Sequence, residues 1–344
     1  MRPERVRLRA GVPLLAGLAV VNLAVWAVAV AVFRHFPVLL GTAFLAYSFG
    51  LRHAVDADHI AAIDNVTRKL MQQGRRPVGA GLWFSLGHST IVFALSAAVA
   101  ASAVAIKAHF GALESFGGIA GTLVSAGFLL GLAAINLLVL VSVITTFRQV
   151  KAGGVYSDED VNLLLARRGF FGRLFRALFG LVQRDWHMYP IGVLFGLGFD
   201  TATEVGVLGI SAAGASHGLP IWSIMLFPAL FAAGMALVDT ADNLLMLGAY
   251  GWAFARPMRK LYYNITITTV SVLVALIVGG LEALGLVQGA YNLSGTFWDP
   301  VAELNNNFGT LGYVIIGIFA SSWIISAAIY KARGYDRIEV TVRD

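Results

Sequence analysis

The sequence contains no cysteine, which excludes disulfide bonds, thiolate metal ligands and cysteine nucleophiles. It also lacks a Walker-type Gly-rich motif ending in Lys, so the chain itself has no usual means of hydrolysing ATP. Neither a His-Glu-x-x-His pattern nor a nucleophile–base pair occurs in it. These absences argue against a metalloenzyme such as a protease or hydroxylase.

Charged residues are also scarce. They make up 13% of the chain, against 58% hydrophobic residues, and the mean hydropathy of +0.76 lies outside the range of soluble globular proteins. Long apolar runs predict an all-α, polytopic integral membrane protein, a bundle of about eight transmembrane helices, with residues 1–344 as a single transmembrane domain. The predicted spans are Val12–Phe33, Val38–Leu51, Val78–Ile106, Ile119–Phe147, Tyr189–Ala213, Ile221–Ala255, Ile265–Val287 and Leu311–Tyr330.

Two of these runs need interpretation. Val12–Phe33 follows four arginines but has 22 residues, which is too long for the usual 7–15-residue apolar region of a signal peptide, so we interpret it as a span. Val38–Leu51 is shorter than the ~20 residues that a spanning helix needs. It reaches that length only with the polar residues that follow it, which places those residues within the bilayer.

Basic residues are distributed very unevenly. Of the 25 Lys and Arg, 22 fall in the two termini and in the 2–3, 4–5 and 6–7 loops, if Arg68 and Lys69 are assigned to the 2–3 loop. By the positive-inside rule, both termini are cytoplasmic, and residues 148–187 form a cytoplasmic loop with short helices. The high pI of about 9.7 therefore reflects topology, and nucleic acid is not an expected partner.

The most informative segment is Arg52–Ile60, which reads RHAVDADHI and is followed by Asp64-Asn65. Charged groups at membrane depth cost roughly 2.5–3.5 kcal/mol for Asp and Arg on insertion scales, so they persist where something uses them. On a continuous helix, a single arc of roughly 140° holds five of these side chains. They are His53, Asp56, His59, Asp64 and Arg52, and Arg52 is spaced i,i+4 from Asp56 for pairing.

Asp58 does not fit that arc, because it points roughly 100° away from His59. Either it faces another helix, or the helix is distorted at this point. Two imidazoles and a carboxylate on one face suit Zn, Ni, Co or Fe. The alternative is a buried salt-bridge network that fastens this helix to its neighbours.

Three other spans carry polar clusters. His88 lies in Leu86–Thr90, beside a glycine and two hydroxyls. The fifth span holds Asp200, Thr201 and Glu204, and the sixth holds Asp239, Asp242 and Asn243. Carboxylates spaced i,i+3 or i,i+4 repel unless a cation or a proton lies between them. A divalent cation would compensate this surplus of acids, and a proton relay is the alternative.

These four segments resemble the nickel/cobalt transporter (NiCoT) family of bacterial and fungal permeases. The resemblance rests on RHAVDADHI, with the signature His-x4-Asp-His at His53, Asp58 and His59, and on LGHS, LGFDTATE and GMALVDTAD in later spans. It implies high-affinity uptake of Ni²⁺ or Co²⁺ across the cytoplasmic membrane, with the second span central to recognition, no enzymatic activity and no cofactor. One departure is Asn243, where the family often has Gly.

The expected partners are thus the divalent ion and the lipid bilayer. We expect the metal site to comprise His53, Asp56, Asp58, His59 and His88. The expected route comprises Arg52, Asp64, Asn65, Asp200, Thr201, Glu204, Asp239, Asp242 and Asn243. Inward movement of a cation gains about 2.3 kcal/mol per charge per 100 mV, so a potential-driven permease needs no further device. Another divalent metal, or export, is the nearest alternative, although the His-rich loops expected of exporters are absent.

Overall fold

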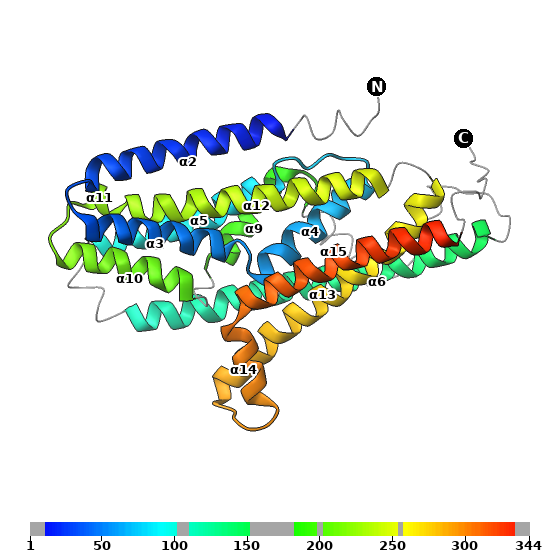
Figure 1. Cartoon of the computed structure of the whole chain (residues 1–344). Helices are drawn as coiled ribbons and strands as arrows, with labels where there is room; N and C mark the ends of the chain where they lie inside the picture. The colour runs from blue at the N-terminus through cyan, green and yellow to red at the C-terminus, as the bar shows by residue number, and fades with distance from the viewer. Residues whose placement is uncertain (1–10, 102–109, 152–181, 198–201, 254–256, 334–344) are drawn as a thin grey trace.

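A computed structural model describes residues 11–101, 110–151, 182–197, 202–253 and 257–333, and the statements below concern those residues. All regular structure in them is helical (Figure 1), which confirms the all-α prediction. The long helices are α2 (Val12–Phe33), α3 (Pro37–His53), α4 (Ala57–Gln72), α5 (Ala80–Ala101), α6 (Phe110–Lys151), α12 (Leu226–Ala253), α13 (Pro257–Tyr291) and α15 (Phe308–Ala332). The shorter ones are η2 (Asp185–His187), α9 (Met188–Phe195), α10 (Ala202–Ser216), α11 (Ile221–Ile224) and α14 (Trp298–Asn306).

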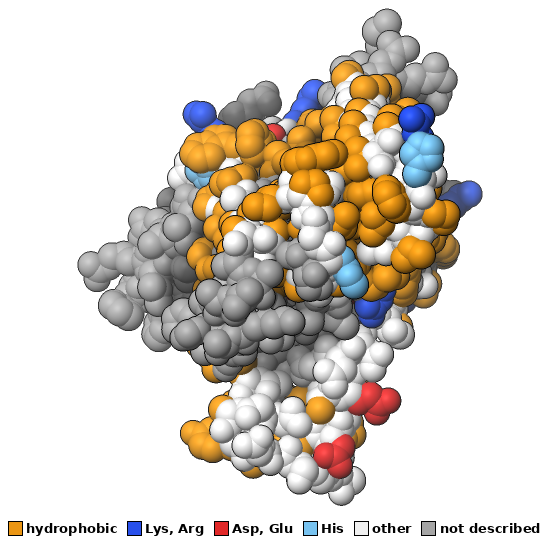
Figure 2. All heavy atoms as spheres, turned by 90° about the vertical axis from the view of Figure 1, so that its left-hand side faces the viewer, with side chains coloured by type: hydrophobic (Ala, Val, Ile, Leu, Met, Phe, Trp, Pro, Cys, Tyr) orange, Lys and Arg blue, Asp and Glu red, His pale blue; other side chains and the backbone are white. Residues whose placement is uncertain are grey.

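Six helices of the described chain are long and apolar enough to cross a membrane, or seven if α3 and α4 count as one bent span. The predicted span Tyr189–Ala213 is instead divided into α9 and α10, which have 8 and 15 residues. Hydrophobic side chains cover much of the described surface in Figure 2, as lipid contact requires. The protein is therefore a polytopic membrane protein, as predicted.

The second predicted span is broken at its polar segment. α3 ends at His53, α4 begins at Ala57, and the two axes differ by 50°. Asp56 between them has extended backbone angles, φ −64° and ψ 147°, and its side chain bonds the His53 ring. Asp favours such breaks because its short polar side chain offers nearby groups an alternative to helical bonding. The expectation of one continuous helical face was therefore wrong, and the distorted alternative is the one observed.

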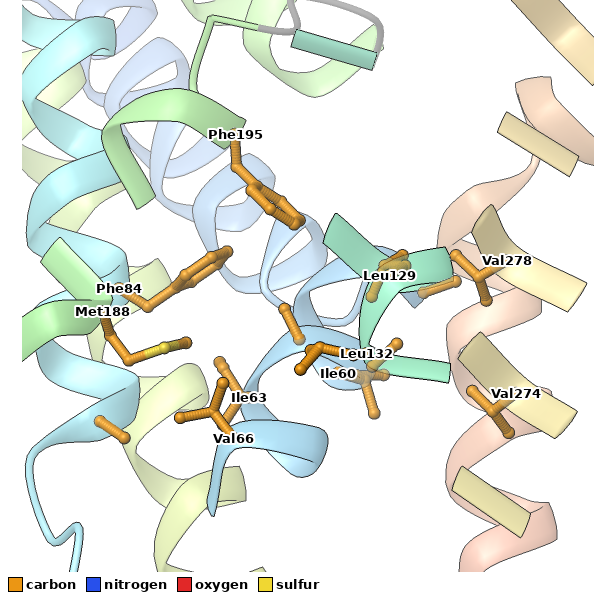
Figure 3. Packing of buried hydrophobic residues seen from close by; sticks show 14 of the residues in the cluster. Ile60, Ile63, Val66, Phe84, Leu129, Leu132, Met188, Phe195, Val274 and Val278 are labelled. Atoms are coloured by element: carbon orange, nitrogen blue, oxygen red, sulfur yellow. The ribbon is translucent and has the colours of Figure 1, made fainter. Parts of the chain in front are cut away.

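Helices from both halves of the chain surround this break. α12 packs on α3, α4 and α5, α9 lies along α5, and α6 packs along α13. Buried apolar side chains of α4 fill the space beside the break (Figure 3), with Ile60 and Ile63 in one cluster with Phe84, Leu129 and Val274. Burial of large side chains such as these fixes α4 against its neighbours.

Glycines permit the closest helix approaches. A Cβ at Gly312 of α15 would overlap the carbonyl oxygen of Val55, in the break between α3 and α4. A Cβ at Gly87 of α5 would overlap the carbonyl oxygen of Tyr189 on α9. Small residues at such crossings let the backbones of membrane helices touch. The break is thus held by direct backbone contact from α15.

The structure corrects one part of the charge assignment. Arg68 and Lys69 lie within α4, not in the 2–3 loop, and both are buried. Their alkyl stems and polar heads are enclosed by the bundle, so they do not count toward the charge asymmetry of the loops. Residues 152–181 of the predicted loop 148–187 lie outside the described part of the chain.

Candidate metal site

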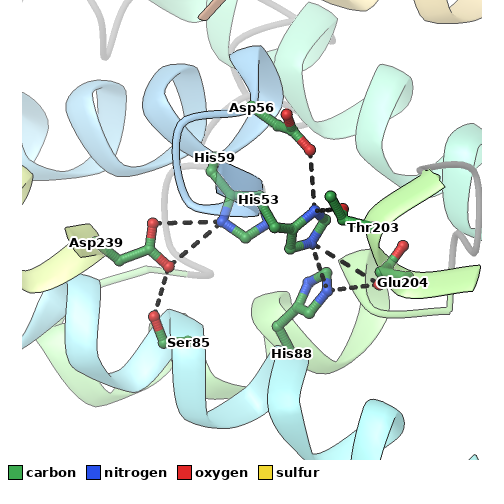
Figure 4. A network of polar contacts seen from close by, with 8 residues as sticks. All are labelled: His53, Asp56, His59, Ser85, His88, Thr203, Glu204 and Asp239. Carbon is green, nitrogen blue, oxygen red and sulfur yellow. Dashed lines mark hydrogen bonds and ion pairs between the residues drawn. The ribbon is translucent and has the colours of Figure 1, made fainter. Parts of the chain in front are cut away.

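Three buried histidines converge beside the helix break. His53 ends α3, His59 lies in the first turn of α4, and His88 lies midway along α5. Each offers one ring nitrogen, and the three nitrogens lie within 4.8 Å of one another. The ring centroids are 4.6–4.9 Å apart (Figure 4). Three imidazoles at this spacing could bind one borderline transition-metal ion.

Carboxylates orient two of the three rings. The Nδ1 atom of His53 is 2.9 Å from Asp56 Oδ2, and Nδ1 of His59 is 3.3 Å from both carboxylate oxygens of Asp239. When Nδ1–H donates to a carboxylate, the Nε2 lone pair is left for a cation. The Nε2 atom of His59 is buried and has no hydrogen-bond partner. A buried ring nitrogen with a free lone pair could bind a metal ion.

The third ring pairs with a carboxylate from α10. His88 Nε2 lies 2.7 Å from Glu204 Oε1 and 3.0 Å from His53 Nε2. His53 Nε2 is itself 3.8 Å from that same oxygen. Two ring nitrogens and one carboxylate oxygen thus face a common point, where a cation or a shared proton would join them. Among the described residues, Glu204 is thus a well-placed oxygen donor for such a cation.

A second layer of contacts holds these groups. Ser85, one turn before His88 on α5, donates a short hydrogen bond to Asp239. Thr203 Oγ1 lies 3.3 Å from His53 Nδ1. The Phe84 ring packs edge-on against His59 with centroids 4.8 Å apart. Aromatic walls exclude water and strengthen the electrostatic interactions inside.

The remaining predicted ligand, Asp58, has no described hydrogen bond to the histidines. Its Oδ1 atom is buried and unpartnered. Arg52 is exposed, and Asp56 bonds His53 instead. No direct Arg52–Asp56 ion pair is found within 4.0 Å among the described residues, because i,i+4 spacing brings side chains into contact only on an unbroken helix.

Other predicted route residues lie apart from the histidines. Asp64 accepts hydrogen bonds from Tyr250 and Ser271. The prediction that Asp64 lies on the same helical face as His53 and His59 was therefore wrong. Asn65 accepts hydrogen bonds from Arg68 and Asn136. The placement of Asp64 follows from the 50° bend, which turns α4 away from α3.

Asn243 fastens α12 to its surroundings. It accepts a 2.6 Å hydrogen bond from Thr67, and it donates to the carbonyl groups of Pro77 and Val78. Asp242, one residue earlier, has a buried Oδ2 atom without a partner. Asp200 and Thr201 lie outside the described residues.

Sequence reasoning missed several buried polar residues. Ser85 could have been found, because it is spaced i,i+3 from His88. Glu282 could also have been found, because it is a carboxylate within a predicted span. It is 2% exposed and accepts a hydrogen bond from Ser125 on α6. Other missed residues are Arg68, Asn136, Thr203, Tyr250, Thr268 and Ser271.

Comparison with known proteins identifies the family of this chain. The family model described as high-affinity nickel-transport protein matches residues 39–329. The chain is 58% identical to the high-affinity nickel transport protein of Cupriavidus necator over 335 residues, 97% of this chain and 95% of that protein. No solved structure matches it significantly.

Relatives named for two different metals also match. Identity is 44% over 311 residues to the nickel transporter NicT of Mycobacterium tuberculosis, which covers 87% of this chain and 80% of the relative. Identity is 41% over 288 residues to the cobalt transport protein NhlF of Rhodococcus rhodochrous, with 83% and 81% covered. The chain therefore belongs to the nickel/cobalt transporter family, whose members are membrane transporters and not enzymes.

Proposed function

We propose that this protein takes up Ni²⁺ or Co²⁺ across the cytoplasmic membrane and binds the ion between His53, His59 and His88. One observation carries the proposal: three buried ring nitrogens lie within 4.8 Å of one another inside a membrane bundle. Polar groups at that depth are costly unless they serve a ligand. The relatives named as nickel and cobalt transport proteins support the choice of metals.

The donor set explains why these ions would be preferred. Imidazole nitrogen suits Ni²⁺, Co²⁺ and Zn²⁺, whereas Mg²⁺ and Ca²⁺ prefer oxygen ligands. Glu204 would add an oxygen ligand. Its negative charge would compensate the positive charge of an ion that has lost its hydration water. Asp56 and Asp239 would hold the rings of His53 and His59 with Nε2 toward the ion. Asp58 would contribute charge at the first turn of α4.

Uptake of labelled metal tests this function directly. Cells that lack their own nickel and cobalt importers should accumulate radioactive Ni²⁺ or Co²⁺ when they express this chain. Excess unlabelled Mg²⁺ should not compete, because it disfavours imidazole. Collapse of the membrane potential should reduce the rate, because the potential supplies about 2.3 kcal/mol per charge per 100 mV. Net efflux of preloaded metal would contradict the proposal.

The direction of insertion gives a separate prediction. Residues 148–187 carry seven Lys and Arg, whereas Arg34 and Lys107 lie in the connections that we place outside. We therefore propose that the 148–187 loop and both termini are cytoplasmic. A cysteine introduced at Arg184, in this cysteine-free chain, should resist an impermeant thiol reagent in intact cells and react after lysis. Rapid labelling in intact cells would overturn this orientation.

A further inference from the structure

Helix α12 bridges α4 and α5 at two levels. At the first level, Asp239 is bonded to His59 of α4 and to Ser85 of α5 (Figure 4). At the second level, one turn further along α12, Asn243 is bonded to Thr67 of α4 and to the backbone just before α5. The second bridge lies outside the metal site, yet it joins the same three helices.

Asn243 is fully buried and uses both ends of its amide. Its Oδ1 atom accepts a 2.6 Å hydrogen bond from Thr67 Oγ1. Its Nδ2 atom donates to the carbonyl oxygens of Pro77 and Val78, at 3.0 and 2.9 Å. Because carbonyl groups can only accept hydrogen bonds, these two partners fix the orientation of the amide. The link is a firm one, since the loss of any partner would leave a buried polar group unsatisfied.

The position of α4 depends on such links because of the break at Asp56. An unbroken helix would fix His59 relative to His53, but α3 ends before the break and the axes of α3 and α4 differ by 50°. α4 also contacts α5 much less than either helix contacts α12. α12 therefore mediates the placement of α4 beside α5.

One side of α5 carries both its contacts to α12 and the third histidine. Gly81, Ser85 and His88 are spaced i, i+4 and i+7, which places them on one side of a helix. A Cβ at Gly81 would overlap the carbonyl oxygen of Asp239, so the backbones of α5 and α12 touch there. The bonds that Asn243 donates fix the chain directly before this contact. The start of α5 is thus held to α12 ahead of His88.

We propose that Asn243 is a positioning residue of the metal site: it sets the separation between α4 and α5, and thereby the spacing of His59 and His88 around the transported ion. The inference rests on the proposed transport function. Selectivity among divalent transition metals depends on the geometry of the site more than on raw affinity, so the spacing of the rings has to be held. Asn243 holds it from one turn beyond Asp239, through bonds to protein groups.

Asn243→Ala removes all three bonds and tests the proposal. In the purified full-length variant in lipid nanodiscs, the affinity for Ni²⁺ should fall about tenfold, the lower end of the effect of residues that hydrogen-bond a metal ligand directly. The visible d–d spectrum of bound Co²⁺ should also change, because it reports the arrangement of the ligands around the ion. A purely structural contact would lower the melting temperature and leave the spectrum of the folded fraction unchanged.

Variants of Thr67 isolate the α4 half of the bridge. Thr67→Val keeps the shape of the side chain but removes the hydroxyl that bonds Asn243, whereas Thr67→Ser retains a hydroxyl. Thr67→Val should change the Co²⁺ spectrum in the same direction as Asn243→Ala, and Thr67→Ser should give the wild-type spectrum. If Asn243→Ala does not yield folded protein, these two milder variants decide the matter.

Asn22→Ala is the matched control. Asn22 is also buried and also donates to α12, at the carbonyl oxygen of Ala233, but it lies on α2, which carries no histidine. This variant loses a buried asparagine and a bond to α12 without touching the bridge between α4 and α5. Its Ni²⁺ affinity and its Co²⁺ spectrum should equal those of the wild type.

Two results would overturn this inference. The first is wild-type Ni²⁺ affinity together with the wild-type Co²⁺ spectrum in folded Asn243→Ala or Thr67→Val. The second is a change of the spectrum in Asn22→Ala as large as that in Asn243→Ala, which would show a general loosening of the bundle. Failure of the proposed function is distinct, because the unmodified protein would then bind neither Ni²⁺ nor Co²⁺.

Discussion

Replacing both His53 and His59 with alanine is expected to abolish binding of Ni²⁺ and Co²⁺ and to stop uptake. The two rings supply two of the three nitrogens that lie within 4.8 Å of one another. Removing a residue that only hydrogen-bonds a metal ligand lowers metal affinity about 10–100-fold. Removing two ligands themselves should lower the affinity by more than that. Equilibrium binding to purified protein, normalised to folded material, measures the effect.

Graded variants separate this outcome from a purely structural role. Asp239→Asn keeps all three imidazoles but weakens the contact that orients His59, so its affinity should fall by about 10–100-fold. His217→Ala changes an exposed histidine and should leave binding intact. If the histidines serve to clamp helices, the double variant will lose abundance and yet bind metal with native affinity in its folded fraction. That result would refute the site.

Replacing Gly312 with valine is expected to disrupt both folding and metal binding. Even a Cβ at this position overlaps the carbonyl oxygen of Val55, which lies in the break between His53 and His59. Overpacking of this kind typically costs 1–3 kcal/mol, and backbone that cannot yield raises the cost. The variant should show a lower melting temperature in detergent and weaker nickel binding in its folded fraction.

Gly317→Val provides the control on the same helix. A Cβ at Gly317 meets nothing within 4 Å, so this variant carries the same change in side chain and helix propensity without the clash. It should resemble the wild type in melting temperature and in nickel affinity. Equal behaviour of the two variants would show that α15 does not hold the break in place.

Composition alone was sufficient to identify the class of protein. The need for about 20 apolar residues per span is a local property, so long runs could be read directly from the chain. The number of spans could not be read in the same way where polar residues interrupt an apolar run. Tyr189–Ala213 reads as one apolar run, yet two short helices, α9 (Met188–Phe195) and α10 (Ala202–Ser216), occupy this part of the chain. Periodicity does not encode such interruptions.

The residue types of the candidate site could also be predicted. His53, His59, His88 and Glu204 were singled out because ionisable groups are rare and costly in apolar spans. Local spacing could not show their partners. Asp239 serves His59 from 180 residues away, and this pairing depends on how α12 crosses α4. Arg68 was assigned to a loop, because a basic residue near the end of a span is usually solvated.

The sequence by itself determined that this chain is a membrane protein, that it carries the family signature, and which side chains could bind a metal. The tertiary structure decided which of them meet. A helical projection assumes a constant 100° per residue, and that assumption fails at Asp56, where the backbone is extended. The resulting bend brings the His53 ring into contact with the His59 ring and leaves Arg52 at the surface. It also places Asp64 beside Tyr250 and Ser271.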